Sequence, residues 1–106
     1  MTVQQDPAAA ARVLVDAVLP PGDDAQVRSH YEHLLLAGRH APLATAFAGR
    51  RAVVDAVLGE LVGRVAAPTS AAVTTAVVDG AVVTALTERR PVRATASALL
   101  LDAWGV

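Results

Sequence analysis

Two arginines interrupt an apolar helical pattern, and they are the residues of this chain best suited to bind a ligand. The spacing between Phe47 and Val54 calls for a further apolar residue near position 50, and the chain has Arg50 and Arg51 there instead. A guanidinium at the mouth of an apolar pocket would bind an anionic group through charge-assisted hydrogen bonds. Alternatively, both stems lie along the apolar face and both charges reach water. Asp55 follows Arg51 by four residues, so an ion pair within the helix is available.

Three histidines precede this pair, and their spacing does not predict a metal site. His30, His33 and His40 fall near one side of a predicted helix, whereas Glu32 lies on another side. A protein zinc site needs three or four ligands, and this spacing fixes no such set. We therefore expect neither a metal nor a cofactor. His30 is expected on the polar flank of the helix or at the rim of a pocket.

The motifs of common enzymes do not occur in this sequence. It has no cysteine, no G-x-S-x-G nucleophile motif, no H-E-x-x-H zinc motif and no glycine-rich phosphate loop. No pair of carboxylates can be assigned to a defined pocket. The sequence therefore predicts a protein that is not an enzyme.

The composition predicts a soluble all-α protein of one domain. Hydrophobic residues make up 54% of the 106 residues but aromatic residues only 3%, so the core must consist of Ala, Val and Leu. The net charge of −1 gives no basic surplus for direct nucleic-acid contact. MTVQQDPAAA has neither the basic start nor the apolar run of a signal peptide, and no uninterrupted apolar stretch is long enough to span a membrane. A cytoplasmic location is expected.

Proline, glycine and capping residues divide the chain into five predicted helices. Asp6 caps the first, Asp23 and Asp24 begin the second, and Thr69 or Ser70 caps the fourth. The expected ranges are 7–19, 24–40, 42–65, 70–88 and 91–104. The second and third helices are each expected to carry one mainly apolar face, formed by Val27, Tyr31, Leu34, Leu35 and Gly38 on the second and by Leu43, Phe47, Val54, Leu58, Leu61 and Val65 on the third.

The segment 69–87 is apolar on all sides and carries one charge, Asp79. A surface helix of a monomer has a polar face opposite its apolar stripe. We therefore expect a second subunit to cover this helix, giving an obligate homodimer. The expected interface residues on this helix and the last one are Val73, Val77, Val78, Gly80, Val82, Leu99 and Leu100.

Asp79 and Gly80 lie together in the middle of this apolar helix. Glycine there costs about 1 kcal/mol relative to alanine, so a close contact with another helix is expected in return. An unpaired carboxylate among valines would be unfavourable. Asp79 is therefore expected either at an exposed edge or, preferably, paired with an arginine across the interface.

Four stretches resemble TetR-family regulators. The run Y-E-H-L-L-L-A-G-R-H-A-P-L (31–43) is similar to the segment before the family's long central helix, and R-R-A-V-V-D-A-V-L-G-E-L-V (50–62) to that helix. V-V-D-G-A-V-V-T-A-L (77–86) resembles the first dimerisation helix, and P-V-R-A-T-A-S-A-L-L-L-D-A-W (91–104) the last helix. The resemblance covers about Ala9 to Trp104. Only MTVQQDP precedes these helices, so the family's helix-turn-helix domain is expected to be missing from this chain.

The resemblance implies a five-helix effector-binding and dimerisation domain whose last two helices form a four-helix bundle with the partner. It also implies a pocket between the second, third and fourth helices for a small hydrophobic or acidic effector. The expected lining residues are Tyr31, Leu34, Phe47, Arg51 and Val54, with His30 at the rim. Two alternatives remain: a module that forms heterodimers with a full-length TetR-type regulator, or an enzyme recruited from this fold for metabolite chemistry.

Overall fold

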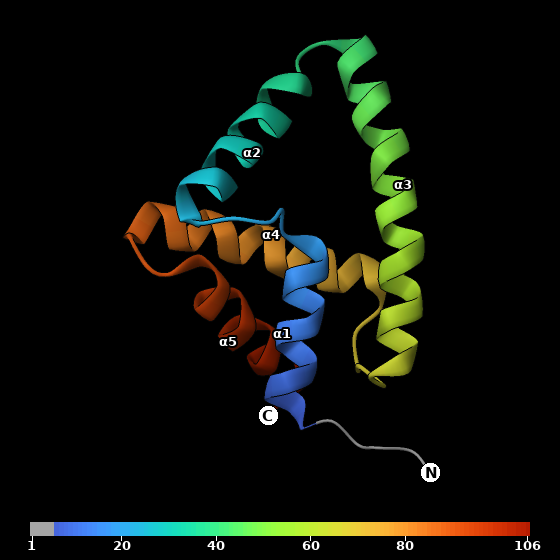
Figure 1. Ribbon diagram of the computed structural model, residues 1–106, viewed down its shortest axis with the longest axis vertical. Coiled ribbons are helices and arrows are strands. Elements are labelled where there is room, and N and C mark those ends of the chain that lie inside the picture. The colour runs from blue at the N-terminus through green and yellow to red at the C-terminus, as the bar shows by residue number, and fades with distance from the viewer. Residues whose placement is uncertain (1–5) are drawn as a thin grey trace.

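A computed structural model describes residues 6–106 as five helices joined by short turns (Figure 1). The helices are α1 (Pro7–Val18), α2 (Asp24–Ala37), α3 (Ala41–Arg64), α4 (Ala71–Glu88) and α5 (Val92–Trp104). Residues 1–5, which belong to the segment predicted not to be a signal peptide, lie outside the described range. The predicted all-α class is confirmed, and each predicted helix is present.

The predicted capping residues begin their helices. The side chains of Asp6 and Ser70 each accept a hydrogen bond from the backbone three residues further on. Asp23 accepts from the Gln26 backbone at 3.0 Å, and the Gln26 side chain accepts in return from the Asp23 backbone at 2.8 Å. This reciprocal capping box satisfies two backbone donors that otherwise lack partners at the start of a helix.

α1, α4 and α5 pack around the central hydrophobic core, with α4 crossing behind α1 (Figure 1). Val78, Val82 and Leu100 are completely buried there. Their assignment to a subunit interface is therefore wrong, because the helices of the same chain already remove them from solvent. α4 is covered on one side by its own subunit, which the sequence pattern alone did not predict.

The opposite side of α4 remains at the surface. This outer face of α4 consists of Val73, Ala76, Gly80, Val83 and Thr87, all of them exposed and uncharged. A Cβ added at Gly80 would meet nothing within 4 Å, so within this chain the glycine serves no close helix contact. Of the remaining predicted interface residues, Val77 is half-buried and Leu99 of α5 is exposed.

α4 is also the one helix within residues 6–106 that is long and apolar enough to cross a membrane, judged by length and composition alone. Core helices of soluble proteins meet the same two criteria. Here α4 contributes six buried residues, and it packs against α1, α3 and α5. Its apolar character is accounted for by this core position and by the outer face.

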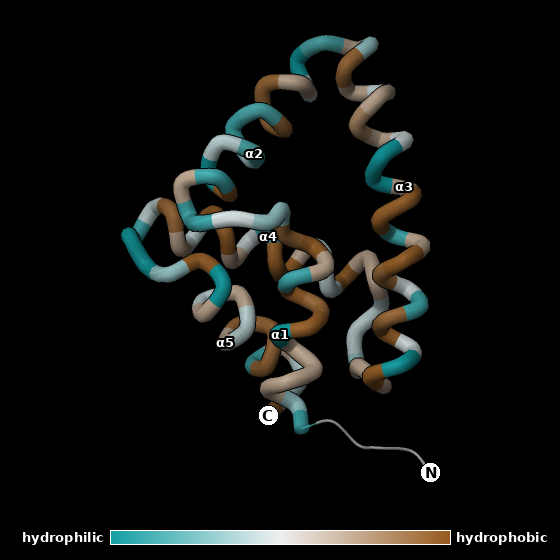
Figure 2. Tube along the Cα trace, in the orientation of Figure 1, coloured by the Kyte–Doolittle hydropathy of each residue, from teal (hydrophilic) through white to brown (hydrophobic). Residues whose placement is uncertain are grey.

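α2 and α3 rise from this core and meet at their far ends (Figure 1). Leu58 is the one fully buried residue of α3, although hydrophobic residues continue along the helix (Figure 2). Leu35 is 73% exposed, and Leu43 and Val54 are also exposed. The predicted apolar faces are therefore only partly buried: Leu35 and Leu43 lie near the far ends of α2 and α3, beyond the helices that could cover them, and Val54 lines a cavity described below.

Side chains from α5 fix two of the turns. Arg93 donates hydrogen bonds to the carbonyl oxygens of Pro20 at 2.8 Å and Gly22 at 3.0 Å, and it pairs with Asp16 at 3.0 Å. Trp104 Nε1 donates to Thr69 Oγ1 at 2.9 Å, next to the start of α4. The turns before α2 and before α4 are thus held against α5.

Replacing Leu58 with alanine should lower the free energy of unfolding by about 2–5 kcal/mol, because the change leaves a cavity at the one fully buried position of α3. Val57→Ala is the matched control, since Val57 is 54% exposed. Urea denaturation followed by far-ultraviolet circular dichroism, at one protein concentration, measures both. Equal losses in the two variants would contradict this account of how α3 is anchored.

Candidate functional site

A cavity of about 740 Å³ lies between α2, α3 and α4. It contains the six residues predicted to contact a ligand, namely His30, Tyr31, Leu34, Phe47, Arg51 and Val54. The rest of its lining is Val18, Gly38, Ala44, Ala48, Arg50, Val53, Thr75 and Asp79. The structure therefore brings the six residues together at one cavity, and their role in binding stays a prediction.

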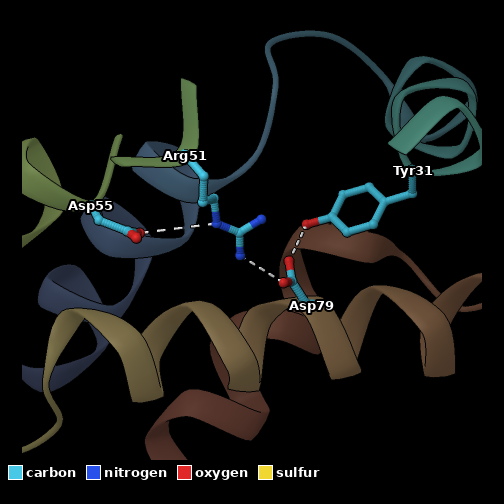
Figure 3. Close-up of polar contacts among 4 residues, drawn as sticks. All are labelled: Tyr31, Arg51, Asp55 and Asp79. Carbon is cyan, nitrogen blue, oxygen red and sulfur yellow. Dashed lines mark hydrogen bonds and ion pairs between the residues drawn. The ribbon is translucent and has the colours of Figure 1, made fainter. Parts of the chain in front are cut away.

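Three polar side chains from three helices meet at this cavity (Figure 3). Asp79 of α4 accepts a hydrogen bond from the Tyr31 hydroxyl of α2 at 2.8 Å through Oδ1. Its other oxygen, Oδ2, accepts from Arg51 Nη2 of α3, also at 2.8 Å. We call Tyr31, Arg51 and Asp79 the polar cluster. Because both carboxylate oxygens are engaged, the cluster joins α2 and α3 to the core helix α4.

This contact corrects one prediction and refines another. The arginine partner of Asp79 lies in the same chain, not across an interface as expected. The predicted pair between Arg51 and Asp55 is present at 3.9 Å, but the contact with Asp79 is much shorter. Arg51 therefore does not hold a free charge at the cavity, since Asp79 balances it.

Burial raises the pKa of Tyr31 well above its ordinary value of 10.0, and the hydrogen bond to Asp79 and the charge of Asp79 raise it further. The positive charge of Arg51 opposes this shift. The hydrogen bond to Asp79 also raises the pKa of Arg51, against the effect of its burial. Within the cluster, the phenol of Tyr31 therefore stays neutral and the guanidinium of Arg51 stays charged throughout the physiological pH range.

Thr75 is the residue of this site that the sequence analysis missed most clearly. It is 6% exposed, it lines the cavity, and its Oγ1 has no hydrogen-bond partner. Thr75 and Asp79 are four residues apart on α4 and so lie on the same face. A hydroxyl residue four positions before the one aspartate of a mainly apolar helix was the signal in the sequence.

The histidines lie apart from this arrangement, except for His30. The His30 ring lies beside Tyr31 in an edge-on arrangement, with 5.6 Å between ring centroids, whereas His33 and His40 do not line the cavity. Within residues 6–106, no group of three or more His, Asp or Glu side chains could hold a metal ion.

A largely apolar cavity with a few convergent polar groups is typical of small-molecule sites in proteins. Residues 5–106 match the family described as "Tetracyclin repressor-like, C-terminal domain", and the chain therefore belongs to this family. Comparison with curated proteins and with solved structures gives no match. Domains of this family are the ligand-binding and dimerisation domains of soluble TetR-type regulators.

Asp79→Asn should lower the pKa of Tyr31, because the negative charge of Asp79 is removed and the positive charge of Arg51 remains. Tyr31 is the one tyrosine of the chain, so phenolate absorbance in the near ultraviolet reports it alone. Asp102→Asn, at an exposed position of α5, is the control and should leave the titration unchanged.

The same shift makes stability depend on alkaline pH. The folded pKa of Tyr31 lies above the unfolded value, so its contribution to stability is complete below pH 10 and is lost as the pH rises further. Above pH 10, the wild type should lose stability over a wider pH range than Asp79→Asn. Identical titrations of Tyr31 in the two proteins would show that Asp79 has no influence on this proton.

Proposed function

We propose that residues 1–106 act as one effector-binding and homodimerisation domain of a cytoplasmic TetR-type transcriptional regulator. The cavity between α2, α3 and α4, with the polar cluster in its wall, is the observation that supports this function. In this proposal, DNA contact is not made by this chain, whose net charge is −1. Binding of a small molecule is its primary activity.

The lining supports a ligand with an apolar body and one oxygen-bearing end. A cavity of about 740 Å³ lies within the usual range of small-molecule sites, roughly 300–1,000 Å³. Leu34, Phe47 and Val54 offer apolar contacts on α2 and α3. Arg51 has further N–H groups beyond the one donated to Asp79, and these can donate to a carbonyl or acidic oxygen of the ligand.

The outer face of α4 supports dimerisation through the last two helices. Its five residues are exposed and uncharged, and Leu99 of α5 is a further exposed apolar residue. Two copies that join α4 and α5 would form a four-helix bundle. The same face could receive a related TetR-type regulator, which would make a heterodimer.

A bulky side chain inside the cavity should abolish binding of an apolar dye. N-phenyl-1-naphthylamine is neutral and fluoresces in apolar surroundings, so its fluorescence measures binding to the purified chain. Val54→Trp, which fills part of the cavity, should weaken binding at least tenfold, about 1.4 kcal/mol. Val57→Trp, on the same helix but outside the cavity, should bind like the wild type. Equal binding by both variants would count against the site.

An arginine on the outer face of α4 should separate the subunits. Val83 is 59% exposed, so Val83→Arg is tolerated by the subunit but would place a charge in the interface. Light scattering at micromolar concentration should show a dimer for the wild type and a monomer with unchanged helical content for Val83→Arg. Val57→Arg, at a similarly exposed position of α3, should remain dimeric. A wild-type monomer would refute the homodimer.

A further inference from the structure

Thr75 carries a hydroxyl that the subunit itself leaves unsatisfied. Within residues 6–106, its Oγ1 is the one buried side-chain nitrogen or oxygen without a hydrogen-bond partner. The preceding residue shows the usual arrangement, because Thr74 Oγ1 contacts Thr69 Oγ1 at 2.8 Å. A buried hydroxyl without a partner destabilises a protein, so such a group requires an explanation. Thr75 lines the cavity, but Oγ1 itself is closed off from solvent, so a ligand could supply the partner once the Thr75 side chain turns about its Cα–Cβ bond toward the cavity.

The charges beside Thr75 favour a neutral ligand over an acid. Asp79 already balances Arg51 at 2.8 Å, and Asp55 lies 3.9 Å from the same guanidinium. A carboxylate entering there would approach Asp79 or have to displace it. Arg50 also lines the cavity, but it is exposed, and water screens its charge. A neutral hydroxyl or carbonyl group of a ligand would not be repelled by the negative charge of Asp79.

On the basis of the proposed function, we propose that Thr75 is a specificity-determining contact of the effector site. The effector is then a neutral, mainly apolar molecule whose hydroxyl or carbonyl oxygen hydrogen-bonds to Thr75 Oγ1. The hydroxyl of Thr75 can donate to either group, and it can also accept from a ligand hydroxyl. Tyr31 and Arg51 stay bound to Asp79 and form the wall beside this contact.

Three probes with the same ring system test this contact in the full chain at neutral pH. 2-Naphthol carries a neutral hydroxyl, 2-methylnaphthalene has no polar group, and 2-naphthoate carries a carboxylate. The wild type should bind 2-naphthol most tightly. Thr75→Val keeps the shape of the side chain and removes the hydroxyl. It should weaken the binding of 2-naphthol about fivefold and leave the binding of 2-methylnaphthalene unchanged. Thr84→Val, on α4 outside the cavity, is the control and should change neither.

A second measurement, without ligand, separates this role from a structural one. Thr75→Val should raise the Tm by about 4 °C, because a methyl group replaces an unpartnered hydroxyl. Thr74→Val should lower the Tm, since it breaks the contact with Thr69. A lower Tm for Thr75→Val would show that the hydroxyl has a partner within the subunit, and would overturn the inference.

If the wild type binds neither these probes nor N-phenyl-1-naphthylamine, the proposed binding function fails and Thr75 loses its role with it. If the wild type binds the probes but Thr75→Val weakens all three equally or none, only the role of Thr75 is overturned. Tightest binding of 2-naphthoate would likewise refute the neutral ligand and leave the binding function intact.

Discussion

The cavity of this protein depends on one carboxylate, that of Asp79. α2 and α3 extend away from the core, and α3 has one fully buried residue along its length. Asp79 holds both helices, α2 through the Tyr31 hydroxyl and α3 through Arg51, and it does so from α4, which the core fixes in place. Removing one partner of such a group leaves a partly buried charge unmatched, so the three side chains are a single unit. The space between α2 and α3 has a defined width because this unit sets the distance between the middle of α2 and the middle of α3.

α4 takes part in every function proposed for the chain. Val78 and Val82 belong to the core, Thr75 and Asp79 line the cavity, and the outer face of α4 remains for a partner. These three surfaces lie at different angles around one helix, and Asp79 and Gly80 are consecutive residues. A rotation of α4 that accompanied ligand binding at Asp79 would therefore move the outer face as well. In the sequence, a helix that contributes to the core, the cavity and the outer face is visible as an apolar helix with one aspartate in its middle.

The local features of the fold could be predicted from the sequence, because they depend on neighbouring residues. Asp6, Asp23 and Ser70 cap helices by bonding to a backbone three residues away, and that spacing is visible in any sequence. The contact between Arg51 and Asp79 joins residues 28 apart, so no local pattern reveals it. The lack of long-range information also explains why Val78 and Val82 were assigned to a subunit interface. Valines on all sides of α4 indicate that both sides are removed from water, but they do not indicate which side is covered by the same subunit. The family resemblance supplied the location of the cavity, and it could not supply the pairing of charges inside it.

Much of the cavity lining consists of side chains with little conformational freedom to lose when a ligand enters. Half of its residues are Gly, Ala, Val or Thr, whose side chains have no rotamers to lose or have one strongly restricted torsion. A ligand would therefore bind here with a small penalty in conformational entropy. Among these short side chains, Tyr31 and Phe47, the one tyrosine and the one phenylalanine of the chain, supply large rings to the lining. Discrimination among apolar bodies of similar volume therefore depends on these two rings and on the few polar atoms in the wall.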